Sequence, residues 1–328
     1  MSVVELESRE LAIEGAGGGL WSDAWSRLRR NPGAIVGFCL VAAFVVVAAF
    51  APLIAPYSPR EGNLALIGPP HYCCPGPSGQ HLLGVDQQGR DELSRIVYGA
   101  RFSLTIGVVA VASGLSIGLV LGAIAGYLGG FVDSLIMRCM DIMLAIPGLL
   151  FAIGVVAMLG AGLYQIMVAV GVVNVPIFAR LLRGSVLAQK ESDFVLAARA
   201  VGVPKRSILA SHILPNSVSP LIVQGTLAMA TAIIDVAGLG FLGLGPQDPG
   251  TPEWGTMLTE VDRYLQSAPF LAIAPGVAIV ISVLGFNLIG DGLREALDPK
   301  LRGRVGRFRE PKAEPLDERL VPEVSESV

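Results

Sequence analysis

The sequence has little charge, since Asp, Glu, Lys and Arg make up only 16% of its 328 residues. None of its four lysines follows a glycine, so the chain lacks the Gly-x-x-x-x-Gly-Lys-Ser/Thr loop that binds ATP phosphates. It also lacks the His-Glu-x-x-His motif of zinc enzymes. We therefore expect no catalytic residues, no metal site and no cofactor in this chain.

Aromatic residues are scarce as well, at 6%, and the basic clusters lie against long apolar runs. This pattern gives no support to nucleic-acid binding, which favours basic surfaces with exposed aromatic residues.

Apolar residues dominate instead, at 52%, and the mean hydropathy is +0.63. Such values are typical of a membrane protein. Uncharged runs cover residues 33–58, 102–132, 142–179, 207–234 and 264–290. Each run reaches the roughly 20 residues that cross a bilayer as a helix. The third is long enough for two helices, with a break at Gly160-Ala161-Gly162, and Pro147 can kink the first of them. The sequence thus predicts an all-α integral membrane protein with six transmembrane helices.

This pattern divides the chain into five parts: a cytoplasmic N-terminal segment (1–32), a first transmembrane helix (33–56), an outer loop with an amphipathic element (57–101), a five-helix core (102–291) and a cytoplasmic tail (292–328). Within the core, residues 184–216 form a loop between spans four and five. The tail is rich in Glu and Pro, so part of it is predicted to be disordered.

The distribution of Lys and Arg predicts the orientation, because these residues favour the cytoplasmic side in short loops. Basic residues gather at 27–30, at 180–206 and at 294–309. With six spans, all three groups fall on one side. Both chain ends are therefore predicted to be cytoplasmic.

Two of the four cysteines, Cys73 and Cys74, are adjacent in the first outer loop, where an oxidising compartment permits a disulfide. A disulfide and a loop without cysteine chemistry both remain open. The spacing to His71 and His81 matches no standard ligand pattern, so a metal site is disfavoured.

Glycines mark two further features. Gly114, Gly118, Gly122 and Gly126 recur every four residues, which predicts a smooth helix face that another helix can approach closely. Around residues 238–245 glycine is too dense for a regular helix. Span five is therefore expected to end in irregular backbone, which must be buried or beside water.

The stretch "VLAARAVGVPKRSILASHILPN" (195–216) places four basic residues between two hydrophobic runs: Arg199, Lys205, Arg206 and His212. Good helix formers surround its alanine pair, Gly202 can end a first helix and Pro204 can begin a second. A basic loop that only followed the positive-inside rule would not need such helix formers. We expect a compact helix-turn-helix on the inner face.

At this stretch the sequence resembles a known family. Ala197-Ala198-x-x-x-Gly202 followed by Ile213-Leu214-Pro215 is similar to the loop by which permease subunits of bacterial ATP-binding-cassette importers dock into their ATPase subunits. Residues 83–101, 240–258 and 286–302 are similar to the C-type permease of dipeptide, oligopeptide and nickel importers, with the dipeptide branch nearest. Leu196 departs from the family pattern by standing where its motif has an acid.

The resemblance implies a type I importer permease fold with a cytoplasmic coupling helix between spans four and five. It also implies half of a translocation path for dipeptides or short peptides, with oligopeptides or nickel complexes as alternatives. The implied partners are a B-type permease, two ATPase subunits that bind ATP and Mg, and an extracytoplasmic substrate-binding protein. The chain would lie in the bacterial inner or plasma membrane.

The competing interpretation is a secondary carrier that acts without ATPases. Carriers commonly have internal repeats and several charged residues near the bilayer midplane. We find neither feature in this sequence, which disfavours a carrier.

Coupling to the ATPase subunit is assigned to eight residues: Ala197, Ala198, Arg199, Gly202, Lys205, Arg206, His212 and Pro215. Small residues would let the helix enter a groove closely, and a glycine can adopt the left-handed conformation that ends a helix.

An amphipathic element is predicted before span two, because Leu93, Ile96 and Val97 fall on one helical face while charged residues fall elsewhere. We expect this helix to lie along the outer surface, where three of its residues would dock the binding protein or the partner permease: Arg90, Asp91 and Arg95. A helix packed only for the stability of its own subunit is the alternative.

Asp235 is the only carboxylate well inside any span, and a charge there is costly in lipid. Together with Gly238, Gly240 and Gly243 it is predicted to line the path or its outer gate, where it would suit the ammonium group of a peptide. The alternative is that Asp235 accepts hydrogen bonds from the irregular backbone after Gly238 and only holds that turn in shape.

Overall fold

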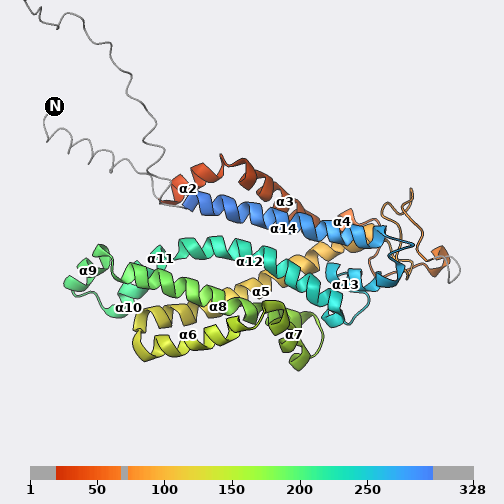
Figure 1. The fold of residues 1–328 in the computed structure, drawn as a ribbon. Coiled ribbons are helices and arrows are strands. Elements are labelled where there is room, and N and C mark those ends of the chain that lie inside the picture. Colours follow the sequence, from red (N-terminus) through yellow and green to blue (C-terminus); the bar gives the residue numbers. More distant parts are fainter. Residues whose placement is uncertain (1–19, 68–72, 298–328) are drawn as a thin grey trace, which may run out of the picture.

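The regular elements in the described part of this chain are helices (Figure 1). The structure is a computed structural model that describes residues 20–67 and 73–297, so the prediction of a disordered tail lies outside the described residues. The elements are α2 (Leu20–Leu28), α3 (Pro32–Ala49), α4 (Ala51–Ile54), η1 (Leu64–Leu66), α5 (Glu92–Leu128), α6 (Gly130–Ala145), α7 (Gly148–Leu159), α8 (Leu163–Lys190), α9 (Asp193–Ala200), α10 (Lys205–Ser207), η2 (Ile208–Ile213), α11 (Leu214–Asn216), α12 (Val218–Leu239), η3 (Gly240–Leu244), α13 (Trp254–Glu260), η4 (Asp262–Tyr264) and α14 (Phe270–Leu297).

Five segments are long and apolar enough to cross a membrane: α3, α5, α8, α12 with η3, and α14. Helices α6 and α7 reach that length only as a pair, which is bent by 96°. The break falls at Pro147, as its position predicts, because proline lacks the N–H that would continue the α6 ladder. Counting the bent pair as one span gives the six spans that the hydropathy pattern predicts.

The third span begins earlier than predicted, at Gly130 and not at Ile142. Gly129 and Gly130 have φ values of +68° and +58°, so the chain turns as soon as α5 ends. The predicted loop between spans two and three is therefore mostly helix.

Ion pairs explain why charged residues can lie inside this helix. Asp133 of α6 accepts a hydrogen bond from Arg183 Nε of α8 at 2.5 Å, and Asp141 accepts one from Arg180 Nη2 at 2.6 Å. In the sequence these aspartates only interrupt an apolar run. In the fold their partners lie on a neighbouring helix.

The helices pack side by side as a bundle with two distinct ends (Figure 1). Helix α14 packs against α3 and α12, and α5 packs along α8 and against α12. Helices α2, α9, α10 and α11 gather at one end, here named the α9 end, while α4 and α13 lie at the opposite end, the α13 end (Figure 1). The loop of residues 191–204 and the loops that flank α13 are thus separated by the length of the bundle.

The predicted glycine stripe forms the close contact between α5 and α8. Gly114, Gly118, Gly122 and Gly126 are all buried. A Cβ atom built on Gly118 would lie 2.6 Å from Phe178 Cβ and 2.9 Å from Val175 O. The two backbones approach so closely because no side chain separates them.

Replacing Gly118 with alanine should destabilise the subunit by about 1–3 kcal/mol, because the added methyl group has no room between the two helices. The matched control is Gly154→Ala in α7, where a Cβ has no neighbour within 4 Å and alanine favours the helix. Thermal unfolding of the two variants in detergent measures the difference. Equal midpoints would contradict close packing at Gly118.

Candidate functional site

A helix-turn-helix caps the α9 end, as predicted. Gly202 turns the chain after α9 with φ +80°, and Pro204 stands just before α10. The Gly202 N–H donates to Arg199 O at 3.1 Å, and the Val203 N–H donates to Ala198 O at 3.0 Å. These bonds satisfy carbonyls that the end of a helix would otherwise leave unpaired, so the left-handed glycine closes the helix.

The two faces of α9 differ in exposure. Val195 and Ala198 are buried against the bundle, whereas Leu196, Ala197 and Arg199 are exposed. Ala197 is therefore accessible to a partner, whereas Ala198 packs within its own subunit, and the role of the two residues in coupling stays a prediction. The reason for the difference in exposure is helical geometry, since adjacent residues point about 100° apart.

Two hydrogen bonds hold this loop against the ends of α5 and α8, and a third joins these two helix ends to each other. The Tyr127 hydroxyl donates to Lys205 O at 2.7 Å, Lys190 Nζ donates to Tyr127 O at 3.1 Å, and Arg199 Nη2 donates to Lys190 O at 3.3 Å. Cations near the last carbonyls of a helix are stabilising. Arg199, predicted as an ATPase contact, thus also bonds its own subunit. No sequence pattern pointed to a role for Tyr127.

The other predicted coupling residues follow the turn. Lys205, Arg206 and Pro215 are exposed. His212 is half-buried within η2, which is a π-helical turn, and its Nδ1 has no hydrogen-bond partner among the described residues. The structure therefore groups six of the eight predicted residues at the turn between α9 and α10, whereas His212 and Pro215 lie in the η2 and α11 segments that lead into α12.

At the α13 end, α12 continues into irregular backbone, as predicted. Segment η3 is a π-helical turn in which Gly243 is non-helical, with φ +77°. Gly240 lies against α13, where a Cβ atom would stand 2.5 Å from Glu253 Oε2. Thr259 Oγ1 donates to Gly240 O at 3.0 Å and to Phe241 O at 2.7 Å. A hydroxyl group of α13 thus provides a hydrogen-bond partner for the carbonyl groups of η3, where the regular helical hydrogen bonds end.

Glu253 fixes the start of α13 beside α5. Its buried carboxylate accepts hydrogen bonds from the N–H groups of Gly255 at 2.9 Å and Thr256 at 2.8 Å, and from Ser103 Oγ of α5 at 3.4 Å. Burial raises the pKa of this carboxyl above its usual range, although the hydrogen bonds act in the opposite direction. The carboxyl group therefore links the segment after α12 to the start of α5.

Asp235 is half-buried in α12. Its carboxylate makes no hydrogen bond with residues 20–67 or 73–297, whereas Thr259 binds the backbone at Gly240 and Phe241. This contradicts the alternative in which Asp235 holds the glycine-dense turn in shape. Gly238 is half-buried one turn further along the helix, with Leu149 of α7 nearby. The predicted role of these residues in a path stays a prediction.

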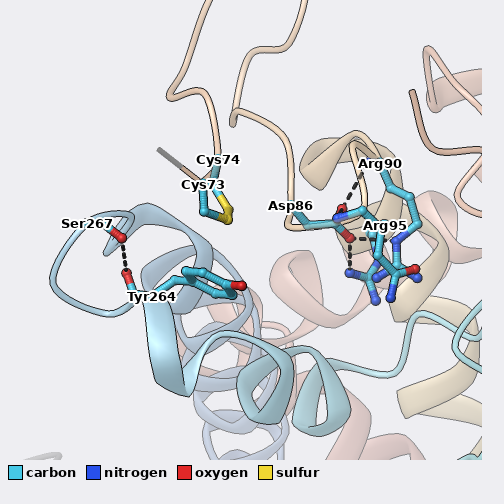
Figure 2. The surroundings of a disulfide bond; sticks show 8 residues. Cys73, Cys74, Asp86, Arg90, Arg95, Tyr264 and Ser267 are labelled. Atoms are coloured by element: carbon cyan, nitrogen blue, oxygen red, sulfur yellow. Dashed lines mark hydrogen bonds and ion pairs between the residues drawn. A yellow bond between two sulfur atoms is a disulfide. The ribbon is translucent and has the colours of Figure 1, made fainter. Parts of the chain in front are cut away.

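A buried ion cluster joins the first outer loop to α13 and consists of Asp86, Arg90, Arg95 and Glu260. Figure 2 shows the first three of these residues. Asp86 Oδ2 lies 2.6 Å from Arg90 Nε and 2.5 Å from Arg95 Nη1. Glu260 Oε2 lies 2.8 Å from Arg90 Nη2 and 2.7 Å from Arg95 Nη1. Both arginine side chains are 2% exposed. Two cations and two carboxylates thus compensate one another within the protein.

The expectation of an outer-surface docking helix is wrong for this segment. Helix α5 begins at Glu92 and continues without a break into the second span. Arg90, Asp91 and Arg95 are all buried. Asp91 caps the helix by accepting from the Ser94 N–H at 2.8 Å. The alternative of packing for the subunit's own stability therefore holds. Local periodicity could not reveal it, because Glu260 is more than 160 residues away.

Cys73 and Cys74 form a disulfide, with an S–S distance of 2.02 Å, which answers the question that the sequence left open. Cys74 is buried with Val261 and Leu271, and Figure 2 shows the disulfide facing the segment that carries Tyr264. The first outer loop is therefore attached to the connection between α13 and α14 at a second place, apart from the ion cluster.

Comparisons with known proteins agree with this arrangement. Residues 118–303 match the family described as binding-protein-dependent transport system inner membrane component. The chain belongs to this permease family. Residues 19–69 of the permease also match the N-terminal TM domain of oligopeptide transport permease C.

Curated relatives match the permease over most of its length. It is 49% identical to the dipeptide transport system permease protein DppC of Alkalihalophilus pseudofirmus, over 86% of this chain and 90% of that protein. It is 47% identical to the glutathione transport system permease protein GsiD of Escherichia coli, over 86% of this chain and 91% of that protein. These relatives place the permease among the subunits of ATP-binding-cassette importers.

The fold of the permease is also seen in a solved structure, an inward-facing conformation of the MetNI methionine ABC transporter. The TM-score is 0.52 at 20% sequence identity, and the match covers 62% of this chain and 96% of that one. This likeness concerns the fold alone. The family match and the curated relatives make the permease a multi-pass membrane subunit of an importer that is not itself an ATPase, which contradicts the interpretation as a self-sufficient carrier.

Proposed function

We propose that this permease forms half of a translocation path for dipeptides or short peptides, and that its α9 end docks an ATPase subunit in the cytoplasm. The observation that carries the proposal is the free face of α9, where Leu196, Ala197 and Arg199 are exposed on a helix fixed by Tyr127 and Gly202. A rigid helix with small and apolar exposed residues is suited to insertion into a groove.

The rest of the complex and the orientation of the chain are part of the same proposal. A related B-type permease supplies the other half of the path, and two ATPase subunits bind ATP and Mg beneath the α9 ends. A substrate-binding protein delivers peptides at the α13 end, and both termini of this chain are cytoplasmic. Peptides are favoured as substrates because the relatives named above are called dipeptide and glutathione permeases.

Purification in mild detergent tests this proposal. The permease should retain a second permease and ATPase subunits, and the binding protein loaded with a dipeptide should stimulate ATP hydrolysis by the complex. Glutathione and a nickel complex serve as comparison substrates in the same assay. A permease that purifies alone and moves peptides into liposomes without ATP would refute the proposal.

Asp235→Asn tests the role of the half-buried carboxylate of α12 in the path. This change keeps the size of the side chain but removes its charge. If Asp235 receives the ammonium group of a peptide, uptake of a free-amine dipeptide should fall about tenfold, while uptake of its N-acetylated form should change little. Equal falls for both peptides, or no fall for either, would rule out recognition of the ammonium group.

A further inference from the structure

An outer pocket of about 890 Å³ lies at the α13 end, between the start of α5 and the start of α8. Its walls are turns of α5 from Tyr98 to Val109 and the first turn of α8, which includes Tyr164. Its roof comes from the two outer loops, at Pro59 and Pro252. Pockets of roughly 300–1,000 Å³ with mainly apolar walls and a few polar groups are typical of small-molecule sites.

Arg101 gives this pocket an uncompensated positive charge. Its side chain lines the pocket and is exposed, and no carboxylate within the described part of the chain forms an ion pair with it. The other arginine of the lining, Arg60, pairs with Asp248 at 3.0 Å. The pocket therefore carries a net positive charge and suits an anionic ligand.

The position of Arg101 along α5 places the pocket at the outer rim of the membrane. Arg101 stands nine residues after Glu92, roughly 14 Å along the helix. The uncharged remainder of α5, residues 102–128, measures roughly 40 Å, which covers a hydrocarbon core of about 30 Å. A solute that arrives at the α13 end thus meets Arg101 before it reaches the spans.

Resting on the proposed function as a peptide importer, we propose that the outer pocket receives the transported peptide and that Arg101 binds its C-terminal carboxylate. A guanidinium group matches a carboxylate with two parallel N–H···O bonds. Every peptide with a free C-terminus offers this group, whatever its side chains. Those side chains would meet the aromatic and aliphatic walls, which impose little chemical selection.

A lipid phosphate is the other anion found at the rim of a membrane. A second groove beside Arg101 helps to distinguish a peptide carboxylate from a lipid phosphate as the ligand of the pocket. Arg101 also borders a groove of about 340 Å³ between α3 and α5, where Thr105 is the only other polar residue among the described residues that line it. Outside residues 68–72, no outer-loop residue lines that groove, whereas Pro59 and Pro252 line the larger pocket. A bilayer lipid would enter the uncovered groove, and a solute delivered from outside would enter the pocket beneath the loops.

The test uses the complete importer in liposomes, with its binding protein saturated by alanylalanine or by alanylalanine amide. Arg101→Gln should reduce uptake of the free acid about tenfold or more and reduce uptake of the amide far less. Arg101→Lys, which keeps the charge without the planar fork, should retain part of the preference for the acid. The matched control is Arg263→Gln, because Arg263 is exposed in η4 at the same end but does not line the pocket.

Equal losses for the acid and the amide in Arg101→Gln would overturn this inference, as expected if Arg101 anchors a lipid phosphate or a carboxylate of the partner permease. If that variant fails to assemble, Arg101→Lys decides in the same way: a selective loss for the acid supports the inference, and an equal loss overturns it. A wild-type importer that takes up neither peptide would instead refute the proposed function itself, so the two failures are distinguishable.

Discussion

Replacing Gly202 with valine should abolish peptide transport and peptide-stimulated ATP hydrolysis while membrane insertion stays normal. Gly202 has φ +80°, a conformation that costs other residues about 1–2 kcal/mol and β-branched residues more. A Cβ atom there would have no neighbour within 4 Å, so the effect comes from the backbone alone. Valine would turn α9 away from its position against Tyr127 and Lys190. We expect at least a tenfold loss of stimulated ATPase activity.

The matched variant is Gly202→Asn, because asparagine adopts the left-handed conformation more readily than any β-branched residue. It should retain most of the activity. Stimulated ATP hydrolysis in the purified complex measures both variants, and the amount of permease in the membrane fraction controls for insertion. If the valine variant couples as well as the asparagine variant, the left-handed turn is not required for docking.

Asp86→Asn should lower the free energy of unfolding by about 3 kcal/mol or more. Asp86 and Glu260 are the two carboxylates that compensate Arg90 and Arg95, and the arginines are buried. Asparagine is similar in size but leaves Glu260 as the one carboxylate of this cluster that still pairs with the two buried cations. Removing one partner of a buried ion pair costs about 3–5 kcal/mol. The thermal midpoint of the detergent-solubilised permease should fall by roughly 5 °C or more.

Arg60→Gln is the control for this experiment. The pair of Arg60 with Asp248 lies at the same end, but its side chains are 64% and 55% exposed. A solvent-exposed ion pair contributes about 0–1 kcal/mol, so the midpoint should hardly change. Similar small shifts for the two variants would mean that water or rearrangement compensates the cluster after the loss of Asp86.

Features set by local sequence could be predicted well. The six spans depend on hydropathy over about 20 residues, the contact between α5 and α8 on a four-residue glycine period, and the turn at Gly202 on a single residue type. The irregular end of α12 followed from glycine density alone. Each of these signals lies within one helix or one turn, where sequence neighbours are also neighbours in space.

Features that depend on distant partners could not be predicted. From local sequence alone, Arg90 and Arg95 are predicted to lie on the exposed face of a helix. Only the fold shows that Glu260 lies beside them and that they are buried. In the sequence, Asp133 similarly predicts the end of an apolar span. In the fold, Arg183 compensates its charge, so the helix continues through this position. Tyr127 lies at the end of a span, where a tyrosine predicts no particular contact. Its hydrogen bond to Lys205 O joins residues that are 78 positions apart in the sequence. Sequence periodicity describes which face is apolar, but it does not identify the polar partner.

Helix α12 lies between two π-helical turns, η2 (Ile208–Ile213) and η3 (Gly240–Leu244), and is itself a regular helix of 22 residues, roughly 33 Å long. We expect the backbone to bend at these two turns more readily than within α12. A displacement at either turn would then tilt α12 as a rigid body. Spin labels at Pro220 and Ile234, both exposed, should keep a constant separation through the transport cycle, while the distance from either label to α14 varies.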